Sequence, residues 1–209
     1  EVTYENFNAC AAKFVINGFN VHPGSAKDTM INALNVAWEL HQMLPAADRP
    51  EHTEDYEGFY HLTDMSGNVE KAEMQYIVRD HDRAAFELRK KELQHIQTVL
   101  NGRYGEGTVE LTITEQYRNM SEKILPHFHL IENAKAAAEE IGLKPLIVPV
   151  RGGTDGAQLS FGGLPCPDIG TGGYAYHGPY EHITAEGMDL SVDLILGVLK
   201  RYASFKAGE

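Results

Sequence analysis

Residues 59–80, FYHLTDMSGNVEKAEMQYIVRD, predict a β-hairpin. The residue types of 59–62 and 72–78 favour strands, and the segment Ser66-Gly67-Asn68 supplies the turn between them. Side chains alternate between the two faces of a strand, so Arg79 is predicted to lie on one defined face of the second strand. Arg79 is therefore a candidate functional residue.

A helix is predicted before the hairpin. Ser25, followed by Asp28 three residues later, forms a capping pair that indicates a helix start. The apolar residues from there to Leu44 follow helical spacing, and Pro45 ends the helix. Residues 14–16, on the N-terminal side, are apolar and predict a strand.

A second helix and a further strand are predicted after the hairpin. Residues 82–100 carry one apolar stripe, and Asp80 or Asp82 is the expected cap at the start of this helix. Residues 109–113 alternate as a half-buried strand does. The order over residues 13–115 is strand, helix, strand, strand, helix, strand, which predicts the βαββαβ arrangement of a ferredoxin-like sandwich.

The remaining sequence predicts part of an α/β layer. Its expected elements are a helix at 130–141, a strand at 146–148, glycine-rich loops at 152–178 and a last helix around 188–202. We therefore expect an α/β protein made of a ferredoxin-like α+β domain at 13–116 and an incomplete α/β domain at 1–12 and 117–209. Because the first residues have strand character without a starting Met, we expect the chain to be a piece of a longer protein.

The composition favours a soluble, cytoplasmic protein. The 209 residues include 18 Lys plus Arg and 30 Asp plus Glu, and the formal net charge of −12 argues against nucleic-acid and anionic membrane partners. Cys10 and Cys166 are too few for a disulfide framework or a cysteine-based zinc site, and they favour a reducing compartment. No apolar run approaches the roughly 18 residues of a membrane-spanning helix.

The glycine-rich segment 170–181 holds the strongest candidate residue, His177. Glycines let the backbone turn tightly and approach a ligand, so they predict that His177 lies on a constrained loop. A neutral imidazole is able to bind zinc there through one nitrogen while Glu181 holds the other. The alternative is a turn whose histidine makes only local hydrogen bonds, and the residue types alone favour it. A dinucleotide-binding loop is excluded, because Pro179 prevents the helix that this motif requires.

Other candidate residues each have a functional and a structural interpretation. Arg151, in RGGTDG at 151–156, either forks onto a carboxylate of a peptide-like ligand or pairs with Asp155 to fix the loop. His22 precedes the first predicted helix, whose N-terminal amides favour an anion or a developing oxyanion, and the alternative is a surface histidine in a turn. We expect His81 to be solvated and Arg118 to have a surface or hinge role.

Several stretches, taken together, carry one resemblance: ENFNA at 5–9, NVHPG at 20–24, YEGFYHL at 56–62, RGGTDGAQLSF at 151–161, and TGGY at 171–174 with HG at 177–178. Over essentially all of its length the chain resembles the peptidase T family, cytosolic tripeptide aminopeptidases with two zinc ions. The resemblance implies that the ferredoxin-like domain is a lid, or dimerisation, domain. It also implies that the flanking segments belong to a zinc-binding catalytic domain.

The resemblance also implies roles for individual residues. His177, with a glutamate four residues later, matches the family's last zinc ligand. His22 matches a lid histidine that reaches an active site, often across the dimer, and stabilises the tetrahedral oxyanion. Arg79 and Arg151 resemble arginines that hold the C-terminal carboxylate of the peptide, and Asn119 is expected to form a hydrogen bond nearby.

The resemblance implies that the family's other zinc ligands and its general-base glutamate lie in an N-terminal half that this chain lacks. Because zinc takes about four ligands, we expect His177 alone to hold zinc weakly or not at all and the chain alone to be inactive. The intact protein is expected to be a homodimer, joined through the lid, that releases the N-terminal residue of tripeptides. The alternative is a non-catalytic dimerisation or substrate-capture module.

Overall fold

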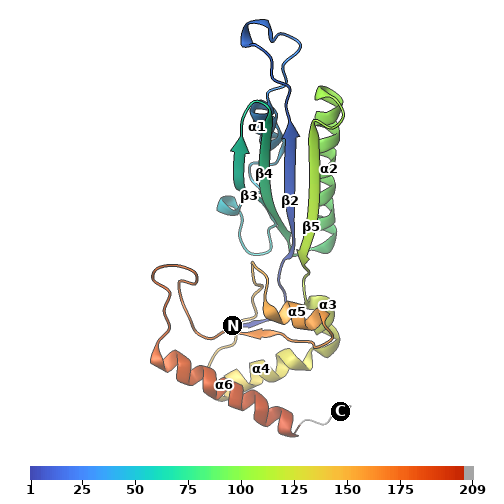
Figure 1. Cartoon of the computed structure of the whole chain (residues 1–209). Coiled ribbons are helices and arrows are strands. Elements are labelled where there is room, and N and C mark those ends of the chain that lie inside the picture. The colour runs from blue at the N-terminus through green and yellow to red at the C-terminus, as the bar shows by residue number, and fades with distance from the viewer. Residues whose placement is uncertain (205–209) are drawn as a thin grey trace. The chain divides into compact units, whose positions relative to one another are not determined.

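The chain folds into two compact units. A computed structural model describes residues 1–204 (Figure 1). One unit is Phe7–Arg118. The other consists of Glu1–Asn6 and the residues from Asn119 onward. The assignment of a lid at 13–116 and of a catalytic portion at 1–12 and 117–209 stays a prediction, and residues 205–209 of the latter lie outside the described part of the chain.

Phe7–Arg118 is an α+β sandwich. Its strands are β2 (Asn8–Asn17), β3 (Phe59–Gly67), β4 (Lys71–Asp80) and β5 (Val109–Tyr117), and its helices are α1 (Ala33–Met43) and α2 (Arg83–Tyr104), with short 3₁₀ turns at Pro23–Ser25 and Pro50–His52. The sheet order is β3-β4-β2-β5 and every neighbouring pair is antiparallel. Both helices lie behind the sheet in Figure 1. This topology confirms the predicted ferredoxin-like fold.

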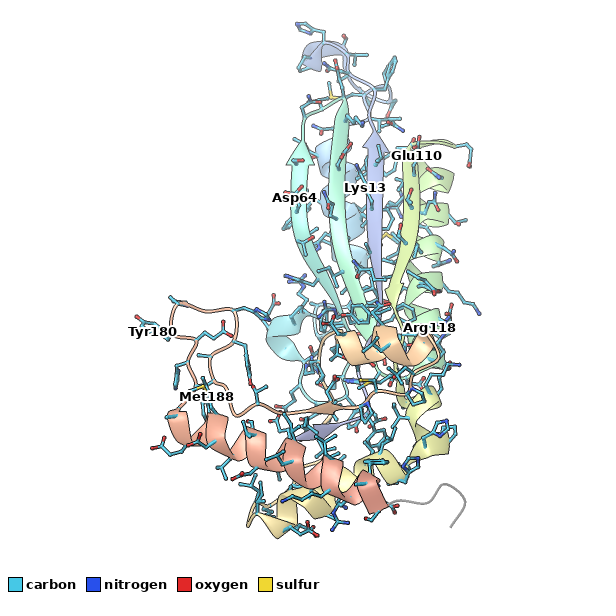
Figure 2. The ribbon with its side chains drawn as sticks, turned by 60° about the horizontal axis from the view of Figure 1, so that its bottom comes forward. Lys13, Asp64, Glu110, Arg118, Tyr180 and Met188 are labelled. Carbon is cyan, nitrogen blue, oxygen red and sulfur yellow. The ribbon has the colours of Figure 1, made fainter. Side chains whose placement is uncertain are left out.

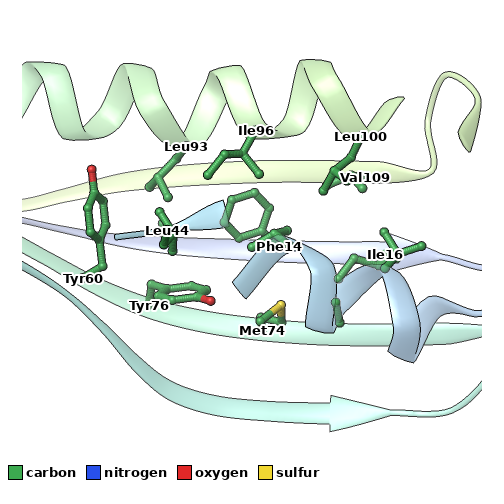
Figure 3. Close-up of a cluster of buried hydrophobic side chains, with 14 of the residues drawn as sticks. Phe14, Ile16, Leu44, Tyr60, Met74, Tyr76, Leu93, Ile96, Leu100 and Val109 are labelled. Carbon is green, nitrogen blue, oxygen red and sulfur yellow. The ribbon is translucent and has the colours of Figure 1, made fainter. Parts of the chain in front are cut away.

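The core of this unit lies between the sheet and the two helices. Alternate residues of β2, including Phe14 and Ile16, are fully buried there, as period-two alternation requires. Figure 3 shows these strand residues facing Leu93, Ile96 and Leu100 of α2. Burying each such side chain contributes roughly 1.5–3 kcal/mol, so this layer fixes which sheet face remains outside.

The predicted start of the first helix at Ser25 is wrong. Asn32 is the cap of α1, and its side chain accepts hydrogen bonds from the backbone N–H groups of Leu34 and Asn35. The segment before it closes as a loop, because Phe19 and Ile31 exchange two backbone hydrogen bonds of 2.8 and 2.9 Å. Asp28, with a φ of 59°, is in the left-handed region that interrupts a helix.

The predicted start of the second helix is confirmed, but one neighbouring expectation is wrong. Asp82 caps α2 by accepting from the Ala85 N–H at 2.7 Å. His81, expected to be solvated, is only 6% exposed, and its ring lies 4.1 Å from the ring of Phe7. Asn8 accounts for this burial, because its amide donates to the carbonyls of both Asp80 and His81 and holds this turn against β2.

The second unit contains a short sheet and several helices. β1 (Val2–Thr3) pairs antiparallel with β6 (Asp168–Ile169), and the helices are α3 (Ser121–Ile124), α4 (His129–Glu140), α5 (Asp155–Phe161) and α6 (Ala185–Ser204), with a 3₁₀ turn at Leu125–His127. α4 packs on α6, where Ala137 lies close to the space that a side chain at position 197 would take, and the His129 ring bonds the Tyr202 hydroxyl at 2.8 Å. The mixed α/β fold class is thereby confirmed.

The strand predicted at 146–148 is not formed. Val2 makes a single parallel bridge with Ile147 and donates its N–H to the Leu146 carbonyl at 2.8 Å. Pro149, which has no N–H, prevents this ladder from continuing. Across the described residues, no helix combines the length and the hydropathy needed to cross a membrane.

Candidate functional site

His22 lies on the exposed loop between β2 and α1. Its Nδ1 accepts the backbone N–H of Gly24 at 3.0 Å. A neutral imidazole has one accepting and one donating nitrogen, so Nε2 carries the proton and is the donor. The predicted helix directly after His22 is wrong, since a 3₁₀ turn at Pro23–Ser25 follows this residue and α1 begins only at Ala33. Any oxyanion would therefore be held by the ring itself and not by helix N-terminal amides.

Arg79 lies on the sheet face that the helices leave open. Its backbone pairs with Ala9 on one side and with Phe59 on the other. The guanidinium carbon lies 5.9 Å from the centre of the Phe59 ring and 5.8 Å from the centre of the Tyr117 ring. Figure 2 labels Lys13 and Asp64, two exposed residues of this sheet. Arg79 is thus a cation held between two aromatic rings.

Asn119 joins two segments of the second unit. Its side-chain oxygen accepts the backbone N–H of Asn6 at 3.3 Å and that of Ser121 at 3.0 Å. In return, the side-chain oxygen of Asn6 accepts the backbone N–H of Met120 at 2.8 Å. Because the oxygen of Asn119 already accepts two hydrogens, a role toward a peptide would have to use its NH₂ group, which donates.

Arg151 is half-buried at the start of the loop that leads into α5. The preceding residue, Val150, donates its backbone N–H to the Glu5 carbonyl at 2.9 Å, which fixes the beginning of the loop. Thr154 caps α5 by accepting the N–H of Ala157 at 3.1 Å. The loop that carries Arg151 is therefore anchored at both ends.

His177 lies on an exposed loop closed by a bridge between Tyr174 and His182. Figure 2 labels Tyr180 on the same loop. The φ of His177 is 63°, a conformation that few non-glycine residues adopt. Glu181 accepts the backbone N–H of His177 at 3.2 Å through Oε2, so the carboxylate bonds the main chain here, and its expected contact with the ring stays a prediction.

The described residues do not by themselves form a zinc site. Within residues 1–204, no group of three or more His, Cys, Asp and Glu side chains is placed so as to hold a metal ion. Structural and catalytic zinc sites take three or four protein ligands. His177 therefore stays a predicted ligand, and the two-zinc cofactor is not accounted for by these residues alone.

Two residues of chemical interest were not identified from the sequence. Tyr117 lies beside Arg79, and its hydroxyl oxygen is buried. Asp168 carries a buried carboxylate oxygen, and burial of the group raises its pKa above the ordinary value. Sequence signals for both are weak, because a strand-end tyrosine and an aspartate after a proline are common.

The fold, His22 and Arg79 together define a class of protein. Phe7–Arg118 is a ferredoxin-like domain that carries an imidazole donor on one loop and a ring-held guanidinium on its open sheet face. An imidazole donor and a guanidinium both bind anionic oxygens. Such a domain suits an enzyme or a binding protein whose ligand carries a carboxylate.

Comparison with known proteins then gives the family. Residues 4–108 match the family described as "Peptidase dimerisation domain", and the chain belongs to this family. The chain is 54% identical to "Peptidase T" of Clostridium novyi (strain NT) over 203 residues, which cover 97% of this chain and 50% of that relative. The resemblance to peptidase T is confirmed, and the chain spans about half the length of the curated relatives it matches.

Solved structures show the same fold. A crystal structure of aminopeptidase PepT from Bacillus cereus ATCC 10987 matches with a TM-score of 0.83 at 18% identity, covering 97% of this chain and 54% of that one. A crystal structure of a tripeptidase from Staphylococcus aureus subsp. aureus mu50 matches with a TM-score of 0.81 at 19% identity, covering 98% and 54%. At these identities the two structures support the fold alone.

Proposed function

We propose that this chain is part of a dizinc tripeptide aminopeptidase that releases the N-terminal residue of tripeptides in the cytoplasm. The observation that carries the proposal is the 54% identity to a peptidase T over 97% of the chain. The chain spans half of that relative, so the activity is proposed for the complete enzyme. His177 is proposed as one zinc ligand of that enzyme, the others lying outside this chain.

The proposed contributions of this chain concern binding and charge. Arg79 and Arg151 would bind the C-terminal carboxylate of a tripeptide, because a guanidinium offers paired donors that match a carboxylate. Asn119 would donate its NH₂ group to the peptide nearby. A carboxylate bound at a fixed distance from the scissile bond would limit the enzyme to short peptides.

His22 would act on the reacting carbonyl. Its Nε2 donates because Nδ1 accepts the Gly24 N–H, and a donor of this kind stabilises negative charge as it develops on an oxygen. The ring needs no proton transfer for this role. Its place on an exposed loop would let it reach an active site of a second copy in a homodimer.

The test uses the full-length gene product and its His177→Ala variant. Zinc content and tripeptide cleavage are measured with zinc supplied, and we expect the variant to lose at least about tenfold in metal affinity or activity. His95→Ala, which removes an exposed histidine of α2, is the control and should behave as the parent does. Equal zinc content and cleavage in parent and His177→Ala would contradict the proposal.

A second candidate function is a dimerisation or substrate-capture module without catalysis of its own. The description of the matching family as a peptidase dimerisation domain favours it. This function predicts dimers without metal, joined through Phe7–Arg118. Light scattering on the metal-free chain is the test, and a monomer at working concentration would contradict this function.

A further inference from the structure

Tyr117 lies in one cross-strand row with Arg79 on the open sheet face. The registers pair Phe59 with Arg79, Arg79 with Ala9, and Ala9 with Tyr117, so the four residues cross all four strands. Neighbouring strands are about 4.7–4.9 Å apart, which leaves Arg79 and Tyr117 two strand spacings from each other. Ala9, between them and fully buried, has only a methyl group, so the two long side chains meet above it.

A β-bulge places Tyr117 in this row. Cys10 pairs with Glu115, and a regular ladder would next pair Ala9 with Gln116, but Ala9 pairs with Tyr117. A shift of one residue moves a side chain to the other face of a sheet, so without the bulge Tyr117 would point toward the helices. Bulges of this kind re-aim side chains and are frequent beside active sites.

The hydroxyl group of Tyr117 has no hydrogen-bond partner inside the described part of the chain. Its oxygen is buried and forms no hydrogen bond there. Buried polar groups are nearly always paired, and leaving one unpaired lowers stability. Burial raises the pKa of Tyr117, and the Arg79 guanidinium opposes this only in part, so the hydroxyl keeps its proton and is a donor at neutral pH.

Arg79 and Tyr117 bring two kinds of hydrogen-bond donor to one place on the sheet. The guanidinium of Arg79 only donates, and the tyrosine whose ring centre lies 5.8 Å from it has a hydroxyl hydrogen to give. A carboxylate accepts about four hydrogen bonds through two oxygens, so it is able to accept from both side chains at once. The rings of Phe59 and Tyr117 flank the guanidinium, which reduces the ordering cost of binding.

We propose that Tyr117 is a ligand-binding residue that donates its hydroxyl hydrogen to the carboxylate bound by Arg79. The inference rests on the proposed function in one respect, that this carboxylate is the C-terminal group of a short peptide. It adds a residue whose direction is set by the bulge and whose hydroxyl has no internal partner among the described residues.

The binding test uses this chain and its Tyr117→Phe variant, which loses only the hydroxyl. Trialanine and its C-terminal amide are titrated to their solubility limits, and NMR shifts of the backbone amides of Arg79 and Tyr117 give Kd. We expect Tyr117→Phe to weaken trialanine binding about 10- to 100-fold and to leave binding of the amide unchanged. Tyr104→Phe, which removes a hydroxyl that donates to Glu39 at 2.6 Å, is the control and should bind as the parent does.

A stability measurement separates a binding role from a structural one. Urea unfolding should show no loss for Tyr117→Phe, because no internal hydrogen bond is removed, and a loss for Tyr104→Phe. A larger loss for Tyr117→Phe, equal trialanine binding by parent and variant, or no shift of the two amides by trialanine would each overturn the inference. Specific binding through Tyr117 in a chain whose full-length gene product cleaves no tripeptide would support this inference and contradict the proposed function.

Discussion

Arg89 and Asp80 form a hydrogen-bonded ion pair in which Arg89 Nε lies 2.8 Å from Asp80 Oδ2. The side chains are 16% and 7% exposed, so the pair is largely removed from water. Arg89 also donates to Asp48 at 2.6 Å, while the other oxygen of Asp80 accepts the Asp82 N–H at 3.0 Å. One arginine of α2 thereby fixes the end of β4, directly after Arg79, and the segment that precedes β3.

Arg89→Ala should destabilise the chain by roughly 3–5 kcal/mol, because it leaves a buried carboxylate without its cation. Arg89→Lys should be intermediate, since an ammonium does not bond both Asp80 and Asp48 through a planar fork. The free energy of unfolding in urea measures both effects. Lys91→Ala, an exposed change on the same helix, is the control, and an Arg89→Ala value within about 0.5 kcal/mol of that control would contradict the assignment.

His41 should make stability depend on pH. Burial lowers the pKa of the ring, Arg49 lowers it further, and Glu51 opposes them. Arg49 donates to Nε2 at 3.2 Å, so the neutral ring carries its proton on Nδ1, which bonds the Tyr76 hydroxyl at 2.9 Å.

The unfolded chain therefore binds more protons than the folded one between the lowered pKa and the ordinary value near 6.5. Stability from His41 is present above about pH 6.5 and is lost as the pH falls through that window. His41→Gln should flatten the urea stability profile between pH 7 and pH 5, and His95→Gln should leave its slope unchanged. A slope in His41→Gln equal to that of the parent would show that His41 does not set it.

Asp168 should destabilise the chain at neutral pH. Burial raises the pKa of the carboxyl, a hydrogen bond from Thr154 opposes this, and Asp155 adds to the rise. One oxygen is buried without a hydrogen bond, and the other lies, with the Cys166 carbonyl, where a side chain at position 156 would have to go. A folded-state pKa above the unfolded value means that stability falls as the pH rises from about 4.

Asp168→Asn removes that charge, so it should stabilise the chain at pH 7 and lose this advantage near pH 4. Urea unfolding at the two pH values is the measurement. Asp64→Asn, at an exposed site of the other unit, is the control. A stabilisation of the same size at both pH values would point to packing and not to the charge.

The parts of the fold that follow local periodicity could be predicted from the sequence. Alternation in β4 put Arg79 on one face, and the side chain of Asp82 marked the start of α2. The start of α1 could not be predicted, because it depends on backbone bonds between Phe19 and Ile31, twelve positions apart in the chain. Local patterns contain no information about such closures.

The same limit explains what was missed around the candidate residues. Tyr117 faces Arg79 because of a one-residue register shift, and alternation along β5 alone would put it on the opposite face. The spacing of His177 and Glu181 suggested a contact with the ring, whereas in the structure the backbone N–H of His177, a residue with positive φ, donates to the Glu181 carboxylate. The sequence therefore shows which residues are candidates more readily than it shows the direction in which each side chain points.

His22→Ala should lower kcat in the full-length gene product by about 10²–10³-fold with little change in KM, because the Nε2 donor would act on charge that develops after the substrate binds. His22→Gln, which offers an NH₂ donor, should recover part of the loss. Lys27→Ala, an exposed change on the same loop, should retain the parental rate. If His22→Ala instead raised KM with kcat unchanged, the ring would be a group that binds the substrate and the transition state equally, and the oxyanion role would be wrong.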